Sequence, residues 1–274
     1  MDTGILYLCA TPIGNLDDIT VRCLNTLKEC DMVACEDTRH SLKLLNHFGI
    51  SKPLTSYYEH NKKEKGEYIV SELKSGKSVA LVTDAGTPAI SDPGEQLVAL
   101  CREKGLNVVP IPGACAFVTA LSASGFDSRR FTFEGFLPPE KKDRREVLDY
   151  YKSDKKTVIF YEAPHKLKDT AKEIYEALGD RRICVAREIT KMNEEIVTYT
   201  LSEFVKVLEE KEPRGEYVLI VEGAKASETA FFENMSIEEH VEFYENQGLS
   251  RMDAIKACAR DRHVPKNAIY KELV

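Results

Sequence analysis

Residues 81–94, with the sequence LVTDAGTPAISDPG, constrain the fold of this chain more than any other segment. They begin inside the apolar run Val79–Val82, which is typical of a strand that is covered on both faces of a sheet. The small residues that follow leave backbone N–H and C=O groups accessible to a ligand. Asp84 falls at the carboxyl end of the strand, where open α/β sheets bind their ligands. The segment therefore predicts a binding loop between a strand and a helix.

The end of the same segment predicts where the next helix begins. Asp92 is placed to cap a helix, Pro93 suits a first turn, and Glu95 stands where a capping box has its acid. Glycine and proline alone would favour a plain turn. The combination of a strand end, a loop of small residues and a helix start favours a ligand site instead.

The first half of the chain alternates short apolar runs with helical patterns. We expect strands at residues 5–9, 32–35, 79–82 and 107–111. We expect helices at residues 19–30, 42–48, 62–74 and 95–104, and a helix of small residues that ends near Gly125. Alternation of this kind predicts a largely parallel sheet.

A second α/β region follows a break near residues 124–130. Its expected strands lie at residues 131–136, 158–161, 183–186 and 217–221, with an edge strand at 195–200. Its expected helices lie at residues 166–178 and 202–210, and residues 137–145 are expected to form a polar loop. The sequence thus predicts two α/β domains, over residues 1–124 and 125–226, with a ligand cleft between them.

The remaining residues, 227–274, are expected to form a small helical tail. Residues 253–262 and 266–273 are spaced like a helix-turn-helix. From Arg251 to Val274 there are six Lys and Arg and three Asp and Glu, whereas the whole chain has a formal net charge of −7. The overall charge argues against broad, non-specific binding of nucleic acid. The tail either contacts nucleic acid locally or only packs against the rest of the protein.

Composition excludes other classes of protein. No apolar run approaches the roughly 20 residues that a membrane span needs, and the N-terminus lacks the basic segment of a signal peptide. The eight cysteines form no CxxC pair and do not cluster with histidine. We interpret them as small buried apolar residues in a reducing cytoplasm, and we expect no metal site.

Polar residues follow several of the expected strands. They occur in the segments 10–20, 36–40 (EDTRH), 161–165 (YEAPH), 186–191 (AREITK) and 213–216 (PRGE). Each alone is equally consistent with a helix cap or an ion pair: Asp37 is a fair N-cap, and Asp17 or Asp18 would cap the helix after the first loop. Together they predict a cleft between two α/β units. The first loop contains only Gly14, so it is no dinucleotide fingerprint, and no P-loop motif is present.

Six short segments follow one another along the chain. They are LCATPIGNLDDIT (8–20), EDTR (36–39), VTDAGTPAISDPG (82–94), PIPGA (110–114), FYEAPH (160–165) and REIT (187–190). In this order they resemble the ribosomal RNA small subunit methyltransferase I family, within the tetrapyrrole methylase fold of S-adenosylmethionine-dependent methyltransferases. The resemblance covers essentially the whole chain, including the helical tail.

The resemblance implies a homodimer that binds S-adenosylmethionine in the cleft and methylates the 2′-oxygen of a cytidine ribose in the decoding region of 16S rRNA. The substrate is then the rRNA itself or the small ribosomal subunit. Many tetrapyrrole methylases have more glycines in the first loop, which favours the RNA-modifying branch. The cofactor-binding residues that the resemblance implies are Pro12, Ile13, Asp84, Ala85, Gly86, Thr87, Ile90, Ser91, Thr119, Ala163 and Gly215.

The chemistry of such a reaction indicates which other residues to consider. A 2′-hydroxyl is a poor nucleophile, so a nearby base assists it, and the oxygen must lie in line with the S–CH3 bond. Asp37, Glu188 and Asp18 are the candidate bases. Arg39, Arg187 and Lys191 are candidate partners for phosphate or for developing charge.

Three other functions are considered. A methyltransferase for a precorrin-type tetrapyrrole carbon would share the fold and the cofactor but would have no evident use for the tail. A non-enzymatic ribosome-binding or assembly protein would bind RNA without transferring a methyl group. A nicotinamide oxidoreductase is disfavoured because its glycine fingerprint is missing.

Overall fold

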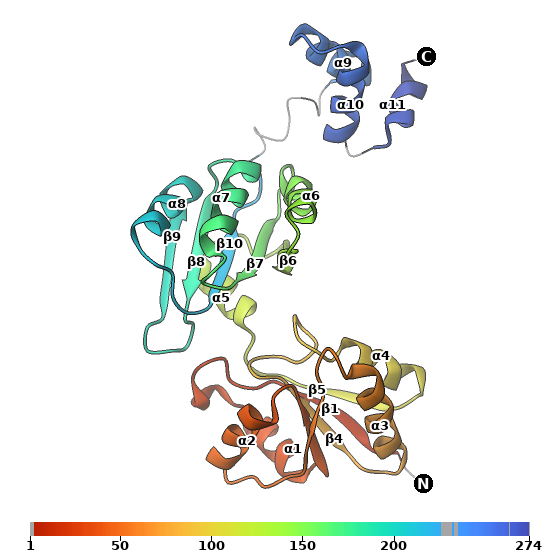
Figure 1. The fold of residues 1–274 in the computed structure, drawn as a ribbon, viewed down its shortest axis with the longest axis vertical. Helices are drawn as coiled ribbons and strands as arrows, with labels where there is room; N and C mark the ends of the chain where they lie inside the picture. Colours follow the sequence, from red (N-terminus) through yellow and green to blue (C-terminus); the bar gives the residue numbers. More distant parts are fainter. Residues whose placement is uncertain (1–2, 226–231, 233–234, 263, 274) are drawn as a thin grey trace.

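Two five-stranded sheets and a cluster of C-terminal helices make up the chain (Figure 1). The computed structural model describes residues 3–225, 232, 235–262 and 264–273. We call the first sheet with its flanking helices the first lobe, the second sheet with its helices the second lobe, and residues 235–273 the tail. The three parts follow one another along the long axis of the molecule. The α/β fold class that the sequence predicts is confirmed.

The first lobe has an all-parallel sheet in the order β3-β2-β4-β1-β5. Its strands are β1 (Ile5–Cys9), β2 (Met32–Cys35), β3 (Leu54–Ser56), β4 (Val79–Val82) and β5 (Asn107–Ile111). Its helices are α1 (Val21–Glu29), α2 (Thr38–His47), α3 (Lys62–Lys74) and α4 (Glu95–Glu103), after a 3-10 turn at Leu16–Asp18. Apolar clusters cover both faces, so the central strand β4 is buried along its whole length.

The second lobe has a mixed sheet in the order β6-β7-β10-β8-β9. Its strands are β6 (Phe131–Phe136), β7 (Thr157–Glu162), β8 (Arg182–Arg187), β9 (Glu195–Thr200) and β10 (Tyr217–Val221). β10 runs antiparallel to both of its neighbours, and β9 forms an edge, as the sequence predicts. The helices are α6 (Lys141–Tyr151), α7 (Leu167–Leu178) and α8 (Leu201–Glu210).

Helix α5 (Ala116–Ser124) connects the two lobes. Its residues Ala120 and Leu121 pack in one cluster with Ile159 and Ile220 of the second sheet. The division at residue 124 that the sequence predicts would assign this helix to the first domain, although its apolar face rests on the second sheet. The boundaries at 124 and 226 stay predictions.

Three local predictions are wrong. Helix α4 has Gly94 as its N-cap with no side-chain cap, so Asp92 does not cap it. Helix α1 is capped by the Thr20 hydroxyl, which accepts from the Cys23 N–H, whereas Asp17 and Asp18 belong to the preceding 3-10 turn. Asp37, by contrast, does cap α2.

The third wrong prediction concerns residues 137–145. Most of this segment lies in helix α6, whose charged first turn hides its apolar face. Leu148 and Tyr151 are the only buried residues of this helix, so the periodic signal appears only near its end. The strand β3 was also not expected, because its three residues are half-buried and carry no apolar run.

The tail contains α9 (Ile237–Asn246), α10 (Arg251–Asp261) and α11 (Lys266–Glu272). They share a small core of Val241, Ala254, Ile255, Cys258, Ala259 and Ile269. The Arg262 guanidinium donates to the carbonyls of Phe232 and Ser236, at 3.2 and 3.1 Å, and also to that of Met235. The helical tail that the sequence predicts is therefore a packed unit of three helices.

The core of the second lobe provides a test of the packing. Phe160 in β7 is fully buried and meets Tyr151 edge to face at 6.0 Å. Phe160→Ala is expected to lower the free energy of unfolding by about 3–5 kcal/mol, because it leaves a cavity in a close-packed cluster. Tyr150→Ala, at an exposed neighbouring ring, is expected to change it by less than about 0.5 kcal/mol. Equal urea midpoints for the two variants would contradict this packing.

Candidate active site

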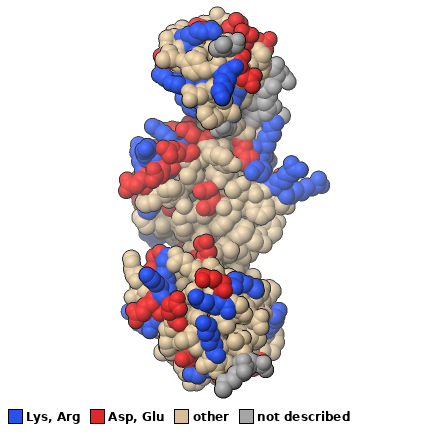
Figure 2. Space-filling model, turned by 90° about the vertical axis from the view of Figure 1, so that its right-hand side faces the viewer, with Lys and Arg blue, Asp and Glu red and all other residues tan. Residues whose placement is uncertain are grey.

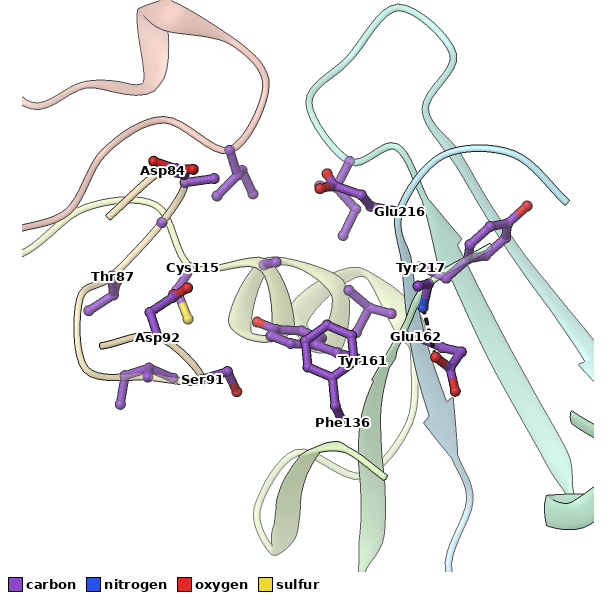
Figure 3. A pocket seen from close by; sticks show the side chains of 18 of the residues that line it. Asp84, Thr87, Ser91, Asp92, Cys115, Phe136, Tyr161, Glu162, Glu216 and Tyr217 are labelled. Carbon is purple, nitrogen blue, oxygen red and sulfur yellow. Dashed lines mark hydrogen bonds between the residues drawn. The ribbon is translucent and has the colours of Figure 1, made fainter. Parts of the chain in front are cut away.

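A cavity of about 470 Å³ lies between the first and second lobes (Figure 3). A pocket of this size is in the range that binds one small molecule or cofactor. From the first lobe and the start of α5, its wall contains Ile13, Asp84, Ala85, Gly86, Thr87, Ile90, Ser91, Asp92, Cys115 and Ala116. From the second lobe, it contains Phe136, Tyr161, Glu162, Ala163, Pro164, Ile189, Glu216, Tyr217 and Val218.

Loops at the carboxyl end of the parallel sheet form the first-lobe wall. Thr11 and Gly86 exchange two backbone hydrogen bonds, of 2.8 and 3.0 Å, which tie the loop after β1 to the loop after β4. The Thr87 hydroxyl donates to the Ala114 carbonyl at 3.0 Å and joins the loop after β5 to them. The loops at the carboxyl ends of β1, β4 and β5 thus lie together, and Asp84 follows β4 at this edge of the sheet, where the sequence predicts it.

Backbone strain is concentrated around this cavity. Within the described ranges, four residues other than glycine have a positive φ: Ala89, Ser91, Glu188 and Thr190. The first pair lies in the loop after β4 and the second pair in the loop after β8. Such conformations cost about 1–3 kcal/mol each and persist where the surrounding structure enforces them.

The two lobes approach closely at both strained loops. A Cβ on Gly135 of β6 would lie 3.0 Å from the Ser91 hydroxyl, and one on Gly14 would lie 2.5 Å from Cγ of Lys191. Because glycine stands at each point, the first-lobe loops lie directly against the second lobe. Glycine at these two points allows the walls of the cavity to approach each other this closely.

Every charged side chain in the cavity wall is an acid. Asp84 and Glu216 face each other at one end, and Asp92 lies on the same side as Ser91, opposite Phe136 and Tyr161 (Figure 3). Burial raises the pKa of Asp92 to about 6; the Thr83 hydroxyl opposes this shift, and the charges of Glu36 and Asp84 add to it. A wall with carboxylates and no Lys, Arg or His attracts a cationic ligand.

The second-lobe wall is more rigid and more apolar. The Tyr161 hydroxyl accepts from the Phe117 N–H at 3.1 Å, and its ring meets Phe133 edge to face at 5.0 Å. The buried Glu162 carboxylate accepts from the Ala163 N–H at 2.8 Å and from the Thr170 hydroxyl at 2.5 Å. This wall can hold a flat apolar group against the acids of the other lobe.

Most of the expected cofactor-binding residues meet in the cavity wall. Ile13, Ala163, Ile90, Ser91 and the run 84–87 belong to it. Three others do not. Pro12 precedes Ile13, the Thr119 hydroxyl donates to the Cys115 carbonyl at 2.9 Å within α5, and Gly215 lies against the Glu188 carboxylate.

The expected base Asp37 and its partner Arg39 lie outside the cavity wall. They form an exposed ion pair of 2.8 Å at the start of α2. The Arg39 guanidinium holds the pKa of Asp37 at about 2, so this carboxylate is a weak proton acceptor. Asp18 lies in the exposed 3-10 turn, and Arg187 pairs with Glu195 at 3.0 Å.

Glu188 and Lys191 lie at the edge of the cavity in a charged network. The Lys191 ammonium donates to Glu188 at 2.9 Å and to Glu216 at 2.8 Å. The Lys191 ammonium holds the pKa of Glu188 below its usual range. Although burial opposes the charge of Lys191, the bonds to Glu216 and Glu188 keep its pKa raised. Lys191 therefore stays protonated and orders the wall residue Glu216.

Sequence reasoning missed several wall residues. Tyr161 and Glu216 fall within polar segments that the sequence singles out, so their positions were available as a signal. Asp92 was interpreted as a helix cap, and Cys115 as a buried cysteine, although its side chain is only partly buried. Phe136 carries no local signal, because the last residue of an apolar strand looks the same whether or not a cavity lies beside it.

Two further properties concern the chain as described. Residues 3–225, 232, 235–262 and 264–273 contain no group of three or more His, Cys, Asp or Glu side chains arranged to hold a metal ion. No helix among them is long and apolar enough to cross a membrane.

Comparison with known proteins identifies the family. The model of the tetrapyrrole (corrin/porphyrin) methylases matches residues 5–205. The chain belongs to the tetrapyrrole methylase family. Among curated relatives of this methylase, proteins of Halalkalibacterium halodurans and Bacillus subtilis are 50% and 48% identical. Each comparison covers 98% of this chain and 94% of the relative, and both relatives are named ribosomal RNA small subunit methyltransferase I. At this identity the methylase also belongs to that group, and it is a methyltransferase.

Solved structures agree on the fold. A cobalt precorrin-4 methyltransferase superposes with a TM-score of 0.59 at 19% identity, covering 80% of this methylase and 94% of that chain. A diphthine synthase gives a TM-score of 0.61 at 15% identity and covers 80% and 90%. In both cases about a fifth of this methylase is not covered.

The close contact at Gly14 predicts how the methylase responds to a single methyl group. Gly14→Ala is expected to weaken binding of the methyl donor at least tenfold, because the new Cβ would push the loop that bears Ile13 away from Lys191 and Thr190. Gly66→Ala in α3 is the control, since its Cβ would make only ordinary van der Waals contacts, at 3.6 and 4.0 Å. Isothermal titration calorimetry measures both affinities. Unchanged donor affinity in Gly14→Ala would mean that this contact does not set the width of the cavity.

Proposed function

We propose that this methylase transfers a methyl group from S-adenosylmethionine to the 2′-oxygen of a cytidine ribose in the decoding region of 16S rRNA. The observation that carries the proposal is the cavity between the lobes, whose charged residues are all acids. Full-length relatives named ribosomal RNA small subunit methyltransferase I support the choice of RNA as the substrate.

The cavity fits this cofactor in charge and in shape. S-adenosylmethionine supplies a methyl group on a positively charged sulfur, which is a good leaving group. Asp84 and Asp92 provide the negative field for a cation of this kind, whereas the charge of Glu216 is paired with Lys191. The backbone of residues 84–87 bears small side chains, so the ligand can lie against its N–H and C=O groups.

We assign the cofactor to the wall residues Ile13, Asp84, Ala85, Gly86, Thr87, Ile90, Ser91 and Ala163. Pro12, Thr119 and Gly215 are proposed to act through their neighbours in the wall, Ile13, Cys115 and Glu216. What the chain contributes is alignment and exclusion of water, because the loops are tied together by Thr11, Gly86 and Thr87.

The residue that assists the hydroxyl is a separate question. Glu188, Asp37 and Asp18 are the candidates that the sequence provides, with Lys191, Arg187 and Arg39 as partners for phosphate. Their positions outside the wall fit contacts with RNA at the mouth of the cavity better than contact with the reacting oxygen.

Two surfaces are proposed to meet the RNA or the small subunit. One is the mouth of the cavity, and the other is formed by α10 and α11 of the tail. Their exposed basic residues are Arg251, Lys256, Arg260, Lys266 and Lys271. Helix α9 carries four acids, so residues 235–273 together hold six Lys and Arg against seven Asp and Glu. The tail as a whole is therefore not basic, and Figure 2 shows Lys and Arg lying beside Asp and Glu in the upper part of the view. Arg251, Lys256 and Arg260 pair with acids of the tail, whereas no ion pair is recorded for Lys266 and Lys271 among the described residues.

The same proposal includes a homodimer that acts in the cytoplasm. The runner-up is methylation of a precorrin-type carbon, which the fold of the solved neighbours shares. No feature of the cavity favours the runner-up.

The decisive experiment supplies labelled S-adenosylmethionine with two substrates. Small ribosomal subunits from cells that lack this gene are expected to take up label on one cytidine ribose, located by mass mapping of the rRNA. Precorrin substrates are expected to take up none. Label on the precorrin alone would establish the runner-up, and binding of subunits without any transfer would favour an assembly protein.

Asp84 gives a prediction for the cofactor. Asp84→Ala is expected to abolish measurable binding of S-adenosylmethionine, because it removes a carboxylate at the carboxyl end of β4 and an acceptor for the Asp37 N–H. Asp143→Ala, at an exposed acid of α6, is the control. Calorimetry that gives equal affinities for Asp84→Ala and the wild type would contradict the assignment.

The tail gives a prediction for RNA. The sequence alone suggests a deletion from Ser250 onward. Because α9 packs on α10, that deletion would expose the apolar face of α9. Removal of residues 226–274 avoids this, since all three tail helices are then absent. This deletion is expected to weaken binding of the small subunit while cofactor affinity is kept. Lys266→Glu with Lys271→Glu tests charge alone, and Glu238→Lys on the acidic helix is its control. If the deletion variant and the full chain bind the subunit equally well, the tail has no role in RNA binding and is only a structural element.

A further inference from the structure

The cavity has two ends that differ in chemistry. At one end Asp84 and Glu216 face each other, next to the loops that bear Ile13 and Gly86 (Figure 3). At the other end Asp92 lies opposite an aromatic pair, Phe136 and Tyr161. A volume of about 470 Å³ suits one cofactor-sized ligand, so a second ligand has to enter through an open end.

Phe136 marks that open end. It is the last residue of β6, its side chain lines the cavity, and it is 56% exposed. Its ring meets Tyr161 edge to face at 5.7 Å, and Tyr161 is in turn held by Phe133 and by the Phe117 N–H. A fixed, exposed aromatic ring at the mouth of a cavity is a surface on which an unstacked nucleobase can lie.

Asp92 stands on the opposite wall without a basic partner. The groups that face it are the acids Glu36 and Asp84, the Thr83 hydroxyl, and Tyr161 from the second lobe. Among the residues that the structure describes, no Lys, Arg or His lines the cavity, so no cation of that wall competes for this carboxylate. Its pKa of about 6 leaves it ionised at neutral pH while it remains basic enough to take a proton.

We propose that Phe136 and Asp92 form the seat of the target nucleotide: the base stacks on Phe136, and Asp92 accepts the proton of the 2′-hydroxyl. The inference rests on the proposed function and adds the residues of its substrate end. In the step itself, the 2′-oxygen forms its bond to the methyl carbon as the carbon–sulfur bond breaks. The hydroxyl proton passes to the Asp92 carboxylate, and the sulfur leaves as a neutral thioether.

The stacking role is tested without turnover. Binding of unmodified small ribosomal subunits is measured by filter retention in the presence of S-adenosylhomocysteine, which transfers no methyl group. Phe136→Leu is expected to weaken subunit binding about 5- to 150-fold and to leave the calorimetric affinity for S-adenosylmethionine unchanged. Phe136→Trp is expected to restore subunit binding. Phe131→Leu, at the exposed start of the same strand and outside the cavity wall, is the control.

A different pattern would overturn this role. If Phe136→Leu weakens cofactor affinity and leaves subunit binding intact, the ring holds the adenine of the cofactor rather than the target base. If Phe131→Leu weakens subunit binding as much as Phe136→Leu, the effect belongs to the strand as a whole.

The role of Asp92 is tested by a pH profile of kcat. In the wild type, kcat is expected to rise with pH, to be half-maximal near pH 6 and to level off above about pH 7, because the base works only when deprotonated and burial raises its pKa to about 6. Asp92→Asn is expected to lower kcat about 100- to 10,000-fold, to abolish that limb and to keep subunit affinity. Thermal unfolding confirms that the variant is folded.

The outcomes separate this inference from the proposed function. If Asp92→Asn keeps both the rate and the acid limb, Asp92 is not the base, while methylation of rRNA by the wild type still stands. If the wild type itself transfers no methyl group to the subunit, the proposed function fails first.

Discussion

The close approach of the two lobes depends on two contacts between backbone and side chain, at Gly14 and at Gly135. They bring the loops after β1 and β4 against the second lobe, opposite Lys191 on one side and beside Ser91 on the other. The described residues other than glycine that have a positive φ lie in the loop after β4 and, on the second lobe, in the loop after β8. Conformational strain is therefore concentrated where the two lobes meet, and loops from both lobes form the wall of the cavity.

Much of the first lobe could be predicted from the sequence, because its short apolar strands and flanking helices follow simple periods. The strand Val79–Val82 and the helix Lys62–Lys74 have the bounds that the sequence indicates. Prediction failed where tertiary packing overrides local signals. Asp92 has the sequence context of a cap but turns into the cavity, and the charged first turn of α6 hides a helix.

Some residues of the candidate site could likewise be predicted from the sequence, and others could not. The loop 84–91 lies on one chain segment, so its place in the wall of a cavity could be predicted from residue types alone. Phe136 and Tyr161 line the cavity only because the second sheet lies opposite that loop. No local sequence pattern predicts this arrangement of the two lobes. The charged residues at strand ends illustrate the converse: Asp37 and Arg39 look like a site in the sequence, yet they satisfy each other at the start of a helix.

The all-acid wall of the cavity has a consequence for turnover. With the proposed donor S-adenosylmethionine, methyl transfer removes one positive charge from the bound molecule, and the carboxylates of the wall would then hold the spent molecule less tightly. Exchange of the used cofactor for a fresh one is thereby favoured by the charge of the wall itself.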